Sequence, residues 1–152
     1  GTETMHLLRA EKGFIIAGQD TDATMTPIDL QMDWIVSKKK YDFIGKRALN
    51  RSDTVKEGRK QLVGILTVDP SIVLEEGAHL VEVETSIPMP MVGHITSSYY
   101  SPNLGRSIAL GLVKNGIKKK GTKLIVPTNN KSIEVKITSP VFIDPENERL
   151  LA

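Results

Sequence analysis

Short apolar segments separated by turn residues dominate the chain after Lys60, with almost no helical pattern between them. They span residues 61–68, 79–84, 91–100, 107–113, 123–126 and 132–137, with a further apolar run at 141–143 as a candidate last strand. Short strands joined by turns of this kind predict an antiparallel β-sandwich or barrel. Closure into a barrel would also remove exposed strand edges. We therefore expect a small antiparallel, Greek-key-like β-barrel in this part of the chain.

The first part of the chain has a mixed pattern, which makes the whole an α+β, mainly β protein. Gly13 is a favourable helix terminator, and Thr26-Pro27 is a typical helix start. Trp34, the only tryptophan, alternates with Val36 and is expected in the core. The elements expected here are a helix at 3–12, a strand at 14–17, a short helix from Pro27, a strand at 34–36 and a helix at 43–49.

A polar stretch at residues 51–60 separates these two patterns, and Val55 is its only apolar residue. Such a stretch is typical of a boundary between structural units. We expect one domain portion at residues 1–58 and a barrel domain at 59–152. The chain begins with Gly1 inside a helical pattern, so it is expected to be a piece of a longer protein.

Composition excludes several classes of function. The 152 residues carry a net charge of +2, which gives no polycationic signal for nucleic acid. Cysteine is absent, so thiolate chemistry is excluded, and the three histidines are not at the spacing of a metal site. No apolar run approaches the roughly 20 residues of a membrane span, and no signal peptide is visible. We expect a cytoplasmic protein with no metal, nucleic-acid or membrane partner.

Two charged positions are candidates for ligand binding. Glu11 lies at the junction between the first helix and the segment that follows, where its carboxylate could accept hydrogen bonds from a planar pair of donors. A solvated glutamate in the last helical turn is the alternative. Lys38, Lys39 and Lys40 follow the predicted strand at 34–36 and could contact the carboxylate tail of an anionic ligand. A run of charge like this is more often simply a solvated loop.

The order of motifs in the first part resembles the aminomethyltransferase (T-protein) superfamily of the glycine cleavage system. LLRAEKG, GQDTD, TP, a tryptophan and a basic run occur in this order between residues 7 and 40. Further on, VGHITS, SP and IALG resemble the C-terminal barrel of that superfamily. Within it, GTETMHLLRAEKGF and GQDTD are most similar to the alpha subunits of heterotetrameric sarcosine oxidases. The resemblance extends over almost the whole chain.

This resemblance implies that the parent protein transfers a one-carbon unit from oxidised sarcosine to tetrahydrofolate, forming 5,10-methylenetetrahydrofolate. Glu11 would bind the pterin and Lys40 would contact the folate, with lysine in place of the arginine typical of the T-protein. That replacement keeps the charge but loses a bidentate contact. The catalytic carboxylate is expected upstream of Gly1, so the fragment alone is expected to be inactive.

The same resemblance implies other sarcosine oxidase subunits as partners. It also implies FAD, FMN and NAD in the full complex, bound outside this fragment. The sequence leaves open a fragment of a T-protein-like aminomethyltransferase, dimethylglycine as the amine, or a non-catalytic barrel module for subunit packing. A nucleic-acid-binding barrel is a weaker alternative, because few aromatic residues are available for stacking on bases.

Overall fold

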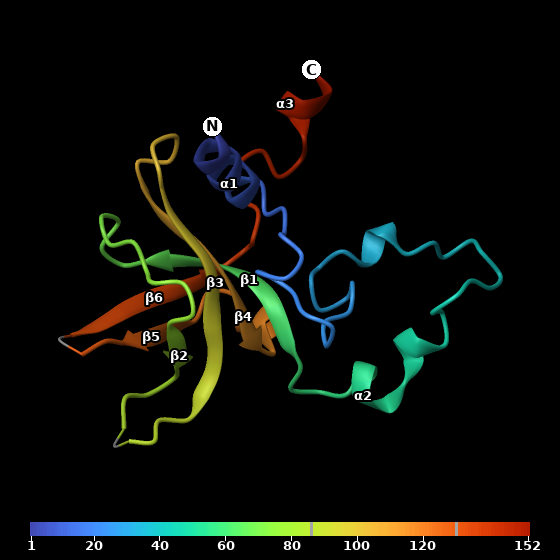
Figure 1. Ribbon diagram of the computed structural model, residues 1–152, viewed down its shortest axis with the longest axis horizontal. Coiled ribbons are helices and arrows are strands. Elements are labelled where there is room, and N and C mark those ends of the chain that lie inside the picture. The colour runs from blue at the N-terminus through green and yellow to red at the C-terminus, as the bar shows by residue number, and fades with distance from the viewer. Residues whose placement is uncertain (86, 130) are drawn as a thin grey trace.

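A closed six-stranded barrel forms most of the described molecule. The computed structural model describes residues 1–85, 87–129 and 131–152. The strands are β1 (Lys60–Thr67), β2 (His79–Val81), β3 (Met91–Ser101), β4 (Arg106–Lys114), β5 (Lys123–Pro127) and β6 (Ser132–Thr138). All neighbours are antiparallel, in the order β1-β4-β3-β2-β5-β6, and β6 pairs with β1 to close the barrel (Figure 1). Each predicted strand from residue 61 to 137 is present, and the mainly β, Greek-key-like prediction is confirmed.

Two layers of apolar side chains lie on opposite faces of β1 and β4, because successive residues of a strand point to opposite sides. Val63, Ile65 and Val113 point into the barrel and belong to its inner core. Leu62 and Leu112, which are opposite each other in the register, belong to an outer core. Ala10 and Leu30 from the first part of the chain, together with Ile108 and Leu110, complete this outer core. The outer core fastens the N-terminal segment to the barrel.

The N-terminal helix α1 (Thr2–Glu11) confirms the predicted helix to within a residue. Gly13 follows with a φ of +73°, the left-handed conformation expected of a helix terminator. A Cβ atom at this position would lie 2.7 Å from the backbone oxygen of Pro140, so the approach of the C-terminal segment also requires glycine. The end of α1 is therefore held against the chain that leaves β6.

Three predicted strands are absent, and two of them flank the barrel. Residues 14–17 form only an isolated bridge between Ala17 and Thr21, and residues 141–143 form no strand. The closed barrel accounts for both failures, because a closed sheet offers no free edge to an additional strand. The apolar run at 141–143 lies beside the end of α1 instead.

The predictions for residues 34–49 are also wrong. Trp34 lies in a 3₁₀ helix, η1 (Asp33–Ile35), and is 74% exposed, so it is not a core residue. Gly45 has a φ of +93°, which ends any α-helix there, and only η2 (Ala48–Asn50) and α2 (Ser52–Val55) follow. Figure 1 shows this segment, in cyan to green, extending away from the barrel. Its apolar side chains therefore have little of the described chain to pack against.

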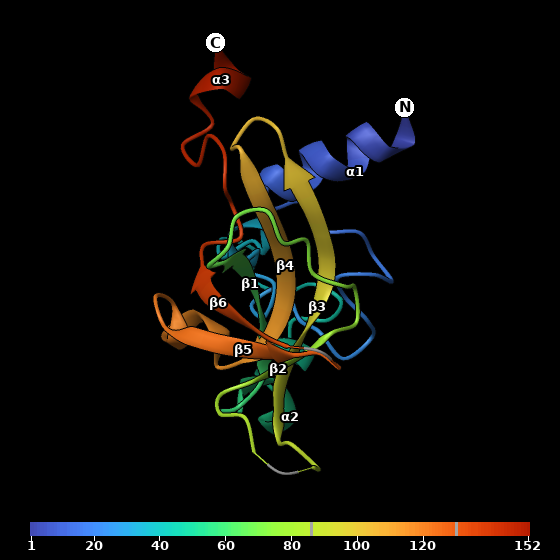
Figure 2. The same ribbon diagram turned by 90° about the vertical axis from the view of Figure 1, so that its left-hand side faces the viewer.

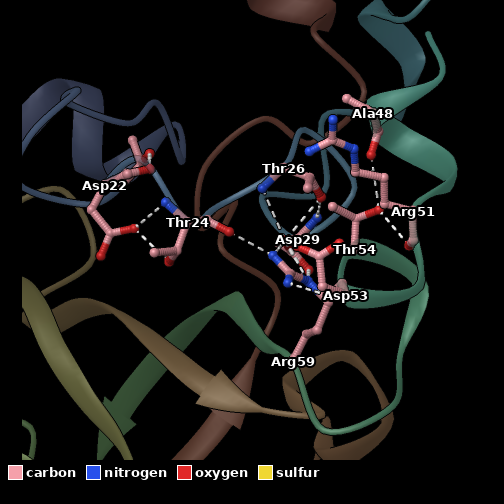
Figure 3. A network of polar contacts seen from close by, with 10 residues as sticks. Asp22, Thr24, Thr26, Asp29, Ala48, Arg51, Asp53, Thr54 and Arg59 are labelled. Carbon is pink, nitrogen blue, oxygen red and sulfur yellow. Dashed lines mark hydrogen bonds and ion pairs between the residues drawn. The ribbon is translucent and has the colours of Figure 1, made fainter. Parts of the chain in front are cut away.

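The segment that follows Thr26 keeps the predicted cap without the predicted helix. The Asp29 backbone N–H donates to the Thr26 hydroxyl at 3.3 Å, and the Thr26 backbone N–H donates to the Asp29 carboxylate at 2.9 Å. This reciprocal pair is the arrangement of a capping box. Arg59 donates to both oxygens of Asp29 and to the backbone oxygen of Thr24 (Figure 3). The ion pair fixes this turn beside the start of β1.

None of the helices in the described part of the chain has the length and apolarity needed to cross a bilayer.

Candidate functional site

The end of α1 places Glu11 in a buried position on the barrel. Its side chain is only 4% exposed. Its backbone oxygen accepts hydrogen bonds from the backbone N–H groups of Phe142 at 2.9 Å and Ile143 at 3.0 Å. The next residue, Lys12, pairs with the carboxylate of Asp144 at 3.1 Å. The C-terminal segment therefore holds the backbone of Glu11 in place, independently of the contacts of its side chain.

The turn between β3 and β4 supplies the partners of the Glu11 carboxylate. Ser101 Oγ donates to Oε1 at 2.5 Å. Asn103 Nδ2 lies 3.1 Å from Oε1 and 3.0 Å from Oε2. A carboxylate at a helix C-terminus is disfavoured by the helix dipole, and burial adds a desolvation cost. These hydrogen bonds offset both effects.

An open groove of about 1010 Å³ borders Glu11. Figure 2 shows α1, the β3–β4 turn and the chain leading to α3 (Glu148–Leu151) at the same end of the barrel. Half of the residues that line the groove are apolar, among them Met5, Leu8, Phe14 and Phe142, and the other half are polar or charged. A large hollow that combines apolar surface with convergent polar groups is typical of sites for small organic ligands. The groove can therefore accept a planar, partly apolar molecule that donates hydrogen bonds to Glu11.

Arg9 and Asp20 form a second polar cluster beside the groove. Asp20 is fully buried and pairs with Arg9 at 2.5 Å. The hydroxyls of Thr96 and Ser97 donate to its other oxygen at 2.5 and 2.7 Å. Asp20 also accepts from the Ile16 backbone N–H at 2.9 Å, as aspartates in turns often do. No sequence pattern indicates the ion pair with Arg9, because the two residues are eleven positions apart.

Tyr99 also contacts Arg9, through its hydroxyl at 3.1 Å and its ring at 5.7 Å from the guanidinium carbon. Tyr100, the next residue, is half-exposed. Two adjacent tyrosines on a strand point to opposite faces. Tyr99 therefore belongs to the Arg9 cluster on the outer face of the barrel.

Lys40 lies apart from Glu11. Lys40 is exposed, and its hydrogen bonds in the described chain are made by its backbone. Its N–H donates to Ser37 Oγ at 3.3 Å, and its carbonyl oxygen accepts from Lys46 Nζ at 3.2 Å. It does not line the groove. Lys38 and Lys39 are exposed in the same segment. In the described chain these lysines and Glu11 do not share one site.

A smaller hollow of about 200 Å³ lies at the start of β1, lined by residues that include Asp22, Lys60 and His94. Burial, followed by the charges of Lys60 and His79, lowers the pKa of His94. Lys56 and Arg59 also line this hollow, and Arg59 is paired with Asp29. The described residues contain no group of three or more side chains arranged to hold a metal ion.

Two family models match the chain. The glycine cleavage T-protein C-terminal barrel domain matches residues 60–144, and the GCVT N-terminal domain matches residues 1–40. A solved structure, the glycine cleavage system aminomethyltransferase T from Bartonella henselae, superimposes with a TM-score of 0.80 at 26% identity. That similarity covers 94% of this chain and 39% of the other.

Curated relatives point to one branch of the family. The sarcosine oxidase subunit alpha of Corynebacterium sp. (strain P-1) is 53% identical over 98% of this chain, and that of Rhizobium meliloti (strain 1021) is 37% identical over 99%. The chain spans 16% and 15% of the lengths of these two relatives. Their names describe them as subunits. The chain therefore belongs to the glycine cleavage T-protein family, as its motifs predicted, and is homologous to the sarcosine oxidase alpha subunits.

Proposed function

We propose that this chain forms one wall of a tetrahydrofolate site in a sarcosine oxidase alpha subunit, with Glu11 as the ligand of the pterin ring. The observation that carries the proposal is a buried carboxylate, held in a fixed orientation, at the edge of a large apolar groove. The 2-amino-4-oxo ring of a pterin presents adjacent N–H and NH₂ donors, which match the two oxygens of a carboxylate. The carboxylate of Glu11 thus matches the pterin edge both in charge and in the spacing of its two oxygens.

The groove supports the rest of this assignment. Its volume of about 1010 Å³ is at the upper end of the range for small-molecule sites. The apolar side chains of Leu8, Phe14 and Phe142 can cover the faces of a planar ring. Bound there, tetrahydrofolate would accept the one-carbon unit released when sarcosine is oxidised. The residues of this chain would bind and orient it. The other carboxylate that lines the groove, Asp144, is paired with Lys12, and the proposal assigns it no part in the chemical step.

Lys40 is the second proposed folate contact, and its exposed ammonium is suited to a mobile anionic tail. Since it lies outside the groove, this contact requires either a ligand that extends beyond the groove or a movement of residues 36–47. A lysine supplies a single point charge to a carboxylate rather than a bidentate pair. Its contribution should therefore be smaller than that of Glu11. The parent protein, its flavin and nicotinamide cofactors and its partner subunits belong to the same proposal.

Calorimetric titration of tetrahydrofolate into the full-length protein that contains this chain tests the assignment of Glu11. Glu11→Ala should weaken binding by about 1.5–3 kcal/mol, the range for hydrogen bonds to a charged group. Glu3→Ala is the matched control, because Glu3 is an exposed glutamate in the first turn of the same helix. Equal affinities for wild type and Glu11→Ala would rule out Glu11 as the pterin ligand.

A further inference from the structure

The Asn103 amide stands where a bidentate ligand of Glu11 would have to bind. Nδ2 is nearly equidistant from the two carboxylate oxygens, at 3.1 and 3.0 Å, and therefore lies in front of the carboxylate on its mid-line. A planar pair of donors needs one nitrogen in line with each oxygen. The mid-line position lies between those two nitrogens, so Asn103 and a bidentate ligand cannot both be accommodated. Ser101 approaches Oε1 alone and leaves Oε2 to other donors.

We propose that Asn103 occupies the ligand face of Glu11 in the free protein and is displaced when the pterin binds. This inference rests on the proposed function, since it takes Glu11 as the ligand. It assigns different roles to two neighbouring residues. Ser101 is a positioning residue that stays on the carboxylate, and Asn103 is an internal competitor of the ligand.

The local structure allows Asn103 to move and prevents Ser101 from doing so. Ser101 is fully buried, and its hydroxyl also accepts the backbone N–H of Leu104 at 3.1 Å. Asn103 lies in the exposed part of the turn at residues 102–105, and its amide has no other partner among the described contacts than Glu11. Rotation about its side-chain bonds would transfer the amide to water, where its hydrogen bonds are replaced. Glu11 itself is fixed through its backbone oxygen by Phe142 and Ile143.

If Asn103 is displaced by the ligand, its truncation should change the binding affinity in the opposite direction from truncation of a positioning residue. If the binding-competent state is the one in which Asn103 has left Glu11, the apparent affinity is reduced by the fraction of molecules in that state. Removing the amide should therefore strengthen binding, whereas removing a positioning group should weaken it. Truncation of Asn103 is therefore expected to raise the affinity for the ligand, and truncation of Ser101 is expected to lower it.

Tetrahydrofolate titrations of the full-length protein test this expectation with three variants. Asn103→Ala should bind about fivefold more tightly than wild type, the factor that corresponds to one net hydrogen bond. Ser101→Ala should bind at least fivefold more weakly. Glu11→Ala reports on the proposed function in the same series.

Two control variants match these truncations. Asn50→Ala removes an exposed amide that donates to the Lys46 backbone oxygen. Ser107→Ala removes a buried hydroxyl for which the described residues supply no hydrogen-bond partner. Both should bind tetrahydrofolate as wild type does. A crystal structure of the complex gives an independent readout, in which Asn103 Nδ2 should lie beyond 3.5 Å from both Glu11 oxygens.

The outcomes separate the inference from the proposed function. An unchanged affinity in Glu11→Ala would overturn the proposed function and the inference together. A large loss in Glu11→Ala with weaker or unchanged binding in Asn103→Ala would leave the proposed function standing and overturn the displacement. A complex in which Asn103 still bridges both oxygens would overturn it as well.

Discussion

Glu11 and Asp20 are both buried carboxylates, but in the described chain only Asp20 is paired with a cationic side chain. Asp20 has a full counter-charge in Arg9, together with two hydroxyl donors. Glu11 accepts from one hydroxyl and one amide, both neutral. The nearby cation Lys12 is committed to Asp144. A compensated charge is suited to holding structure together, whereas Glu11 keeps its negative charge available to donors from a ligand.

Asp20→Ala should therefore act on stability. Removing one partner of a buried ion pair costs about 3–5 kcal/mol, because the other charge is left uncompensated. The free energy of unfolding, measured by denaturant titration, should fall by that amount. The double variant with Arg9→Met should recover part of the loss, since the unpaired cation is then gone as well. A loss below about 1 kcal/mol would show that the pair is not a structural anchor.

Among the elements, the turn at residues 24–29 depends on one ion pair with the start of β1. Burial acts to raise the pKa of Asp29, but hydrogen bonds from Arg59 and Thr26 outweigh it and hold that pKa below its ordinary value of 3.8. A carboxylate with a lowered folded-state pKa stabilises the fold above its unfolded pKa. That contribution is lost as pH falls through the folded-state value.

We expect this pH dependence to be visible in Asp29→Asn. At neutral pH the variant should be less stable than wild type, as measured by the free energy of unfolding. Below about pH 3.8 the difference should shrink, because Asp29 is then protonated in the unfolded wild type. The difference is lost when the pH also falls below the lowered pKa of the folded state. Asp22→Asn is a comparison variant. Hydrogen bonds from Thr24 also lower the pKa of Asp22, but Asp22 is exposed and has no ion-pair partner among the described residues, so the loss of stability at neutral pH should be smaller. A difference that stays constant down to pH 2 would contradict the assignment.

An element can be predicted from the sequence when its signals are local, and it is missed when its structure depends on residues far away in the chain. The barrel strands carry their own signals, alternation and turns, so their positions could be inferred. The strand expected at 14–17 and the buried position expected for Trp34 depended on neighbours that a closed barrel does not offer. The motif singles out Glu11 as a candidate, but its hydrogen-bond partners Ser101 and Asn103 are 90 and 92 residues away from it. No local pattern reports a contact over that distance.

At the scale of the whole molecule, the groove is assembled from three parts that are distant in sequence. α1, the β3–β4 turn and the C-terminal segment meet at one end of the barrel (Figure 2). The segment that carries Lys40 leaves the barrel on another side (Figure 1). The domain boundary between residues 58 and 59 remains a prediction. Helix α1 lies before this boundary but packs on β3 and β4, which lie after it, so the arrangement does not test it.

The backbone of the barrel should be much better protected from proteases than the segment that carries Lys40. In the 152-residue chain, trypsin should cut first at Lys38, Lys39, Lys40, Lys46 and Arg47, which lie in an exposed segment outside the sheet. Lysines of the barrel such as Lys123 and Lys136 also expose side chains, but their backbone groups are paired in the ladder of β5 and β6. Proteolysis requires local opening, which is rare where both strand neighbours are in place. Mass spectrometry of a short digest should find no early cuts within the strands β1 to β6, and early cleavage inside a strand would contradict the closed sheet. Cuts in an exposed connection, such as the one that carries Lys118 and Lys120, would not.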